Sequence, residues 1–418
     1  MNWHLIFYNT NPSDHSELRT FFDMTPVAHI TLKPGKEQSL YRKHPWVFSG
    51  AIAKMDNIAK SGDVVEVEDS KGNFLGAGHF SEGSITVRIF SFTPDYTSEN
   101  FWKSKIAEAY EVRRTLGFIG NNETSIYRLV HAEGDGLPGL IIDIYGKTAV
   151  IQTHSAGMHM MRHELADALK YVYGNEITAI YDKSAEKLSK NSTTESVNSY
   201  LFGEKLDTEA LEHNCKFLID WEEGQKTGFF IDQRENRHLL GELSKGKKVL
   251  NTFCYTGGFS VYALKGGATL VHSLDSSQKA LDLTEDNIRI NGFENSNHKV
   301  IKADAVDYMK NLEEDYDIIV LDPPAFAKHL SARHKAVQGY KRINEAAISQ
   351  IKPGGIIFTF SCSQAVDKTL FTNTVIAAAI SAGRNIRILH QLHQPADHPI
   401  NIYHPEGEYL KGLVVMVN

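Results

Sequence analysis

The second half of the chain alternates strand and helix patterns, and this alternation constrains the fold more than any other feature of the sequence. Strand-like apolar runs occupy residues 248–251, 270–275, 299–302, 316–322, 355–360 and 412–417, and helical stretches separate most of them. Runs as apolar as residues 317–321 are typical of parallel strands that are covered on both faces. We therefore predict a doubly wound, Rossmann-like α/β domain over residues 206–418.

The first half of the chain predicts two smaller domains. Residues 25–95 alternate apolar and polar side chains around a hairpin turn at 70–73, which indicates a small β-barrel-like domain. Residues 96–205 mix helical patterns with strands, which indicates an α+β domain; helices are expected at 99–116 and 158–172 and a strand at 177–182. Residues 187–197 are polar and predict an exposed loop, and residues 1–24 are expected to be either an unfolded leader or a misassigned start.

Charge and cysteine content narrow the function. The 418 residues carry a formal net charge of −7, so the overall charge does not indicate nucleic-acid binding. Basic residues are nevertheless concentrated at 29–60 and 325–344, and phosphate binding needs such local clusters. Three widely spaced cysteines fit neither a disulfide framework nor a metal site. Because the chain has neither a signal peptide nor an apolar run long enough to span a bilayer, we expect a cytoplasmic protein that binds no membrane.

Ligands of doubly wound domains bind where the strands end, and the first three predicted strands end in suitable residues. Gly257 and Gly258 follow the first strand and would let the backbone approach a ligand, although a tight turn would also need them. Asp275 ends the second strand, where an acid can accept both ribose hydroxyls of a nucleoside. Asp304 follows the third strand and would either accept an adenine amino group or cap a helix. Ser276 is predicted to cap the helix over 277–291.

The fourth and fifth predicted strands end in residues that could bind and react with a substrate. Asp322 precedes two prolines, which make the loop rigid. Such a loop could bind a flat base that forms hydrogen bonds. Cys362 stands between two serines at the rim of the expected cleft, a setting that suits a reactive thiol. Carbon 5 of cytosine is a poor nucleophile until a thiolate adds to carbon 6, so its methylation needs one well-placed cysteine. Cys215 and Cys254 are expected to pack structurally.

Taken together, these motifs resemble those of the RlmI-type 5-methylcytosine methyltransferases of large-subunit ribosomal RNA. The likeness runs from about residue 31 to the C-terminus. It is carried by the segments 42–50 (RKHPWVFSG), 135–139 (DGLPG), 226–234 (KTGFFIDQR), 255–258 (YTGG), 322–324 (DPP), 339–341 (GYK), 361–363 (SCS) and 396–399 (ADHP). The resemblance implies an N-terminal PUA domain, a central α+β domain and a class I methyltransferase domain whose cofactor is S-adenosyl-L-methionine.

The resemblance also implies roles for individual residues. Cys362 would be the nucleophile and Asp322 its partner at the base. The cofactor would lie against Gln233, Arg234, Asn251, Phe253, Tyr255, Thr256, Gly257, Asp275, Ser276, Asp304, Ala305 and Asp322. Large-subunit ribosomal RNA, the implied partner, would contact the basic residues Lys33, Arg42, Lys43, Lys328 and Lys341. Other RNA cytosine-5 methyltransferases carry a second cysteine in the loop after strand four, and none stands here, so the base that removes the C5 proton is left unassigned.

Three other functions fit parts of the pattern. A methyltransferase acting on a base nitrogen would share the Asp-Pro-Pro loop and would not need Cys362. A non-catalytic RNA-binding assembly factor would share the N-terminal domain and would not bind the cofactor. A nicotinamide oxidoreductase fits least, because the GxGxxG fingerprint is missing. The sequence leaves open which nucleotide is modified, whether naked RNA or an assembly intermediate is the substrate, and whether the protein is a homodimer.

Overall fold

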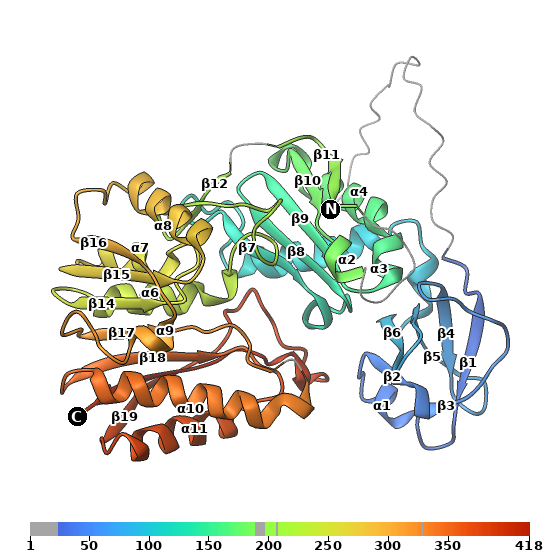
Figure 1. The fold of residues 1–418 in the computed structure, drawn as a ribbon. Coiled ribbons are helices and arrows are strands. Elements are labelled where there is room, and N and C mark those ends of the chain that lie inside the picture. The colour runs from blue at the N-terminus through green and yellow to red at the C-terminus, as the bar shows by residue number, and fades with distance from the viewer. Residues whose placement is uncertain (1–23, 189–196, 206–207, 328) are drawn as a thin grey trace.

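The computed structural model describes residues 24–188, 197–205, 208–327 and 329–418 (Figure 1). Residues 1–23 of the predicted leader, most of the predicted loop at 187–197 and Lys328 therefore lie outside the described residues. Where the structure does describe these segments, it differs from the prediction: Met24 packs against a core cluster, and residues 187–188 end the helix Ala185–Leu188 with Leu188 buried. Within the described part of the chain, no helix combines the length and apolar character needed to cross a membrane.

The N-terminal domain is a six-stranded sheet in the order β2-β6-β5-β4-β1-β3. Its strands are β1 (Ala28–Leu32), β2 (Trp46–Phe48), β3 (Ile52–Met55), β4 (Val64–Glu68), β5 (Phe74–Phe80) and β6 (Ile85–Ser91), with one short helix, α1 (Gln38–Tyr41). Alternate side chains of these strands form a core cluster, as the period of two in the sequence requires. The predicted hairpin at 70–73 joins β4 to β5, which pair antiparallel, with Gly72 at φ +83°. The β character of this segment is confirmed.

The central region is a five-stranded sheet in the order β11-β10-β9-β8-β7 with helices on one face (Figure 1). It contains α2 (Phe101–Thr115), β7 (Ile126–His131), β8 (Leu140–Tyr145), β9 (Thr148–Thr153), α3 (Ala156–Met160), α4 (Arg162–Tyr173), β10 (Ala179–Asp182), α5 (Ala185–Leu188) and β11 (Ser199–Phe202). The single helix predicted at 158–172 is wrong: two helices meet at Met161, where ψ is 3°. Met158, Met161 and Leu165 all enter one core, so the apolar spacing continues across the break and hides it.

The C-terminal domain is a seven-stranded sheet in the order β16-β15-β14-β17-β18-β20-β19. Its strands are β14 (Lys248–Thr252), β15 (Leu270–Asp275), β16 (His298–Lys302), β17 (Ile318–Leu321), β18 (Gly355–Ser361), β19 (Ile386–Leu392) and β20 (Lys411–Val417). The first five are parallel and β20 is antiparallel to β18. Every residue of β17 is buried, because helices cover both faces of the sheet. The doubly wound domain is confirmed.

The helices of this domain are α6 (Arg234–Leu243), α7 (Gly258–Lys265), α8 (Gln278–Ile290), α9 (Ala305–Tyr308), α10 (Arg333–Gln350) and α11 (Lys368–Ser381); a hairpin of β12 (Glu209–Glu212) and β13 (Cys215–Leu218) precedes them. The prediction that Ser276 caps α8 is wrong. Ser277 is the N-cap and accepts from the Ala280 amide. Asp275 accepts the Ser277 amide at 2.9 Å, and this turn delays the start of the helix by one residue.

Candidate active site

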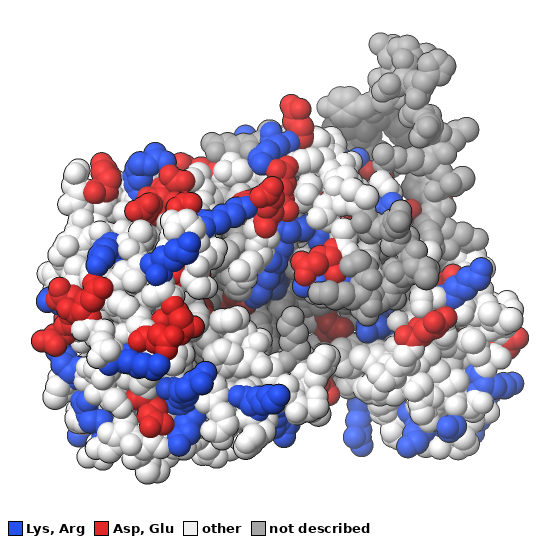
Figure 2. All heavy atoms as spheres, viewed as in Figure 1, with Lys and Arg blue, Asp and Glu red and all other residues white. Residues whose placement is uncertain are grey.

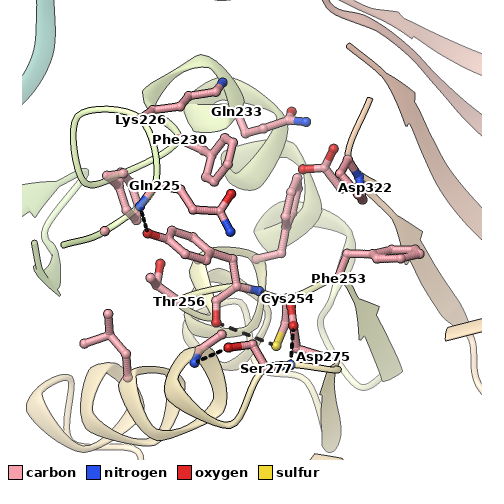
Figure 3. Close-up of a pocket in the computed structure, with 18 of the residues that line it drawn as sticks. Gln225, Lys226, Phe230, Gln233, Phe253, Cys254, Thr256, Asp275, Ser277 and Asp322 are labelled. Carbon is pink, nitrogen blue, oxygen red and sulfur yellow. Dashed lines mark hydrogen bonds between the residues drawn. The ribbon is translucent and has the colours of Figure 1, made fainter. Parts of the chain in front are cut away.

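A cavity of about 400 Å³ opens where β14, β15, β17 and β18 end (Figure 3). Four segments of the C-terminal domain enclose it: the stretch from Asp220 to Arg237, the loop after β14, the start of α8, and the loop after β17. Cys362 and Leu410 complete the lining. This is the position at which doubly wound domains bind their ligands.

The loop after β14 enters the cavity in a strained conformation. Phe253 and Tyr255 have φ values of 56° and 47°, in the left-handed region that non-glycine residues avoid. Such residues cost roughly 1–3 kcal/mol each and gather at ligand sites. Gly257 also has positive φ, and a Cβ there would lie 2.6 Å from the Thr284 side chain. The glycine is therefore required by both backbone and packing.

Asp275 holds this loop and faces the cavity with the carboxylate expected to accept ribose hydroxyls (Figure 3). One oxygen accepts the Tyr255 amide at 3.0 Å and the other accepts the Ser277 amide at 2.9 Å. These two bonds orient the carboxylate, and each oxygen keeps a lone pair for a ligand. A nucleoside therefore fits this end of the cavity.

Asp322 lies on the cavity wall beside Gln233 (Figure 3). The Gln233 amide oxygen accepts from Asn236 at 2.6 Å, which leaves its NH₂ group to hydrogen-bond Asp322. Loss of water around Asp322, followed by the negative charge of Asp232, raises the pKa of Asp322 from 3.8 to about 7. A carboxyl with this pKa can donate or accept a proton near neutral pH.

Cys362 is the more accessible of the two thiols that line the cavity. Burial raises the pKa of the Cys362 thiol, and the Lys226 ammonium is the largest opposing influence. Burial raises the pKa of Cys254 to about 12 and that of Cys215 to about 11. Thiolate chemistry is therefore least hindered at Cys362.

Lys226 and Asp232 are cavity residues to which the sequence interpretation assigned no role. The Lys226 Nζ lies 3.1 Å from Asp232 Oδ2 and 4.4 Å from the centre of the Phe230 ring. Both charged residues belong to the segment 226–234, one of the motifs that carry the family resemblance. That motif was the sequence signal that could have pointed to them.

The structure brings together most of the predicted cofactor residues but not all of them. Gln233, Phe253, Tyr255, Thr256, Asp275, Ser276 and Asp322 line the cavity together with Cys362. Arg234, Asn251, Gly257, Asp304 and Ala305 do not.

Local contacts explain where these outlying residues lie. Arg234 is fully buried and paired with Asp397 at 2.7 Å. Asn251 is buried in the strand and donates to Ser260 at 2.9 Å. Asp304 caps α9 by accepting two backbone amides, which is the alternative role that the sequence allowed.

Lys328 lies outside the described residues; the other predicted RNA-contacting residues lie away from the cavity, on the surface. Arg42 and Lys43 are exposed, and the Lys43 Nζ lies 4.8 Å from the centre of the Phe92 ring. Lys33 donates to the Gly50 carbonyl at 3.0 Å, and Lys341 on α10 lies 4.0 Å from Glu345. Figure 2 shows Lys and Arg side chains along the lower edge of the N-terminal domain, which agrees with the basic stretch predicted there.

Two family models match the chain. Residues 30–92 match a PUA-like domain, and residues 172–403 match an S-adenosylmethionine-dependent methyltransferase. The "Ribosomal RNA large subunit methyltransferase I" of Aeromonas hydrophila subsp. hydrophila is 40% identical over 396 residues, which cover 93% of this chain and 99% of that protein. The chain belongs to this methyltransferase family. The protein of the same name from Escherichia coli O139:H28 is 38% identical over 398 residues, covering 93% of this chain and 99% of that one.

Solved structures of other methyltransferases show the family fold. A SAM-dependent methyltransferase from Streptococcus mutans aligns with TM-score 0.78 at 23% identity, covering 93% of this chain and 99% of that chain. SMU.776, a methyltransferase in complex with S-adenosylhomocysteine, aligns with TM-score 0.80 at the same identity and coverage. The PUA-like domain, the Rossmann-like fold and dependence on S-adenosylmethionine are thus established for this family member.

Proposed function

We propose that the protein methylates carbon 5 of a cytosine in large-subunit ribosomal RNA through a covalent adduct with Cys362. One observation carries the proposal: the accessible thiol of Cys362 shares a methyltransferase cavity with Asp322, a carboxyl whose pKa is about 7. The RNA class comes from the names of relatives that are up to 40% identical. Such a substrate would place the reaction in the cytoplasm.

The cofactor is proposed to lie against the cavity residues predicted for it, with the adenosine end near Asp275 and the transferable methyl near Cys362 and Asp322. S-adenosylmethionine bound there supplies an electrophilic methyl group. The exposed basic residues Lys33, Arg42 and Lys43 are proposed to contact RNA phosphates.

The chain's own residues prepare the base for methyl transfer. The target cytosine must leave its stack to reach the cavity. The Cys362 thiolate then adds to C6, and the electrons of the C5–C6 double bond make C5 nucleophilic. Protonated Asp322 donates to N3 and stabilises the charge that enters the ring. After C5 is methylated, loss of the C5 proton restores the double bond and expels the thiolate.

The first test is to incubate the protein with large-subunit ribosomal RNA and labelled S-adenosylmethionine, digest the RNA and identify the labelled nucleoside. We expect 5-methylcytidine. Label in a different nucleoside would favour a methyltransferase acting on a base nitrogen. Absence of label from naked RNA and immature subunits, together with failure to bind the cofactor, would favour an assembly factor.

The covalent step predicts a specific loss of activity in Cys362→Ala. Methylation should fall by about a thousandfold or more, because nothing else adds to C6, while binding of S-adenosylhomocysteine persists. Cys215→Ala, which removes a buried thiol outside the cavity, serves as the matched control. RNA containing 5-fluorocytidine should trap the wild-type protein, since fluorine cannot leave as a proton. Retained turnover in Cys362→Ala would rule the adduct out.

A further inference from the structure

Lys411 is a buried lysine beside the proposed nucleophile, and the chemistry described above does not use it. It is the first residue of β20 and is 5% exposed. Its Nζ donates to the Ser363 carbonyl at 2.8 Å and to the Tyr409 carbonyl at 2.6 Å, and no carboxylate pairs with it among the described residues. A buried ammonium without a counter-ion is costly, which points to an anion that forms nearby.

Lys411 contacts the turn that carries Cys362 at both of its ends. In the antiparallel ladder of β18 and β20, Lys411 pairs with Ser361, the residue before Cys362. Its ammonium bonds the carbonyl of Ser363, the residue after Cys362. The lysine is therefore placed so that its charge acts on the thiol between these two contacts.

The surrounding charges make Cys362 the main electrostatic partner of Lys411. Burial lowers the pKa of Lys411, and negative charge at Cys362 opposes this effect more than the charges of Glu408 and Asp367 do. In turn, the Lys411 ammonium opposes the rise in the pKa of Cys362 that burial causes. The other titratable side chains around the two groups are Lys226, Asp232, Asp322 and Tyr340 near Cys362, and Lys368 and His393 in the hollow beside Lys411.

Lys226 also opposes the rise in the pKa of Cys362, but its charge is already compensated. The Lys226 side chain is 41% exposed, and its Nζ lies 3.1 Å from Asp232 Oδ2, so water and a carboxylate both screen it. Lys411 has neither form of compensation, because it is buried and its partners are neutral carbonyls. A thiolate at Cys362 would supply the negative charge that Lys411 lacks.

Uncharged groups already hold the turn after Cys362 in place. The Ser363 Oγ accepts from the Ala327 amide at 3.3 Å and shares a hydrogen bond of 2.9 Å with the Tyr340 hydroxyl. Ala327 follows β17 in the loop that begins at Asp322, so these bonds join the two loops of the cavity. Because neutral contacts fix the turn, a purely structural role would not need a buried charge at Lys411.

We propose that Lys411 is a positioning residue that holds the turn around Cys362 and stabilises the Cys362 thiolate. The assignment rests on the proposed function, because that function makes Cys362 the nucleophile.

Alkylation of Cys362 by iodoacetamide tests the assignment in the free protein. Only the thiolate reacts, and mass spectrometry of the Cys362 peptide gives the rate as a function of pH. In Lys411→Met, the midpoint of this profile should rise by about one pH unit or more, which is the effect of removing a neighbouring opposite charge. Lys411→Arg keeps the charge and should keep a midpoint close to that of the wild type.

Tyr340→Phe is the matched control, because it removes an uncharged hydrogen bond from the same turn. Its midpoint should equal that of the wild type. An unchanged midpoint in Lys411→Met, or an equal rise in Tyr340→Phe, would overturn the proposal.

A reciprocal measurement covers the case in which Lys411→Met fails to fold. Two interacting groups shift each other's titration equally, so Cys362→Ala should lower the pKa of the Lys411 ammonium, followed by NMR. An unchanged pKa of Lys411 would overturn the proposal. Neither RNA nor cofactor enters these experiments, so a negative result leaves the cytosine proposal intact, and retained turnover in Cys362→Ala leaves the alkylation result unchanged.

Discussion

Asp322 and Asp232 line the same cavity, yet their pKa values move in opposite directions. Burial would raise the pKa of Asp232, but the Lys226 ammonium, the charges of His398 and Arg128 and the hydrogen bond from Tyr409 together hold that pKa below its ordinary value. Asp322 is shielded from water, and no cation pairs with it directly among the described residues. Both this burial and the negative charge of Asp232 disfavour its ionised form and raise its pKa. One carboxyl is thus fixed as an acceptor while the other can carry a proton near neutral pH, which suits them to different ligands.

The raised pKa of Asp322 predicts a pH-dependent stability. Its folded pKa of about 7 exceeds the ordinary value of 3.8, so its contribution to stability is fully present below about pH 4 and is lost as pH rises through 7. Asp322→Asn removes this loss. The variant should therefore gain on the order of 1–3 kcal/mol in free energy of unfolding over wild type between pH 4 and pH 8. Urea unfolding at the two pH values measures the gain; an identical pH dependence in both proteins would contradict it.

At the scale of elements, α6 is tied to the segment between β19 and β20 by one buried ion pair. Arg234 opens α6, and its guanidinium bonds the carboxylate of Asp397, with both side chains fully buried. The carboxylate also accepts the backbone amide of Arg128 on β7 at 2.9 Å. The pair therefore joins the central sheet to two segments of the C-terminal domain. Its geometry assigns Arg234 a structural position behind the cavity wall.

This arrangement predicts what Arg234→Met will do. The substitution leaves the buried Asp397 carboxylate with the His398 ring at 3.0 Å and the Arg128 amide but without its guanidinium partner, which should cost about 3–5 kcal/mol in free energy of unfolding. Arg289→Met, which breaks an exposed pair with Asp286 on α8, should cost no more than about 1 kcal/mol. Urea denaturation compares the two variants. A small loss in Arg234→Met accompanied by weak binding of S-adenosylhomocysteine would instead support a direct cofactor contact.

At the scale of the whole molecule, the central sheet joins the PUA-like domain to the catalytic domain. One face of the sheet packs on its own helices, while Ile126, Tyr145 and Val150 enter the core of the catalytic domain. Trp46 of the PUA-like domain donates to Glu133, and the centre of its ring lies 4.3 Å from that of the His404 ring, in the segment before β20. The surface proposed to bind RNA is thereby held at a defined position relative to the cavity.

Arg42→Ala tests whether the PUA-like domain binds RNA independently of cofactor binding in the cavity. Arg42 is exposed on the PUA-like domain, so its loss should weaken binding to large-subunit ribosomal RNA and lower the salt dependence of log Kd by about one. Binding of S-adenosylhomocysteine should not change. Lys71→Ala, on the same domain but outside the basic stretch 29–60, is the control. Equal effects of the two substitutions would argue against a specific RNA-contacting surface.

The sequence by itself determined the features that rest on local pattern. The apolar runs predicted the parallel strands, because a strand covered on both faces has no polar side to show. The residues at the strand ends predicted much of the cavity, because parallel strands bring their carboxyl ends to one edge. Edge strand β19 was not predicted; most of it is exposed, so it lacks that apolar signature.

Only the tertiary structure decided which polar residues meet. Arg234 and Asp397 lie far apart in sequence, and no local pattern shows that each neutralises the other in the interior. The pairing of Lys226 with Asp232 likewise depends on a turn held by the central sheet. The burial and the electrostatic environment of a side chain depend on neighbours from many segments of the chain. They are therefore set only when the chain folds.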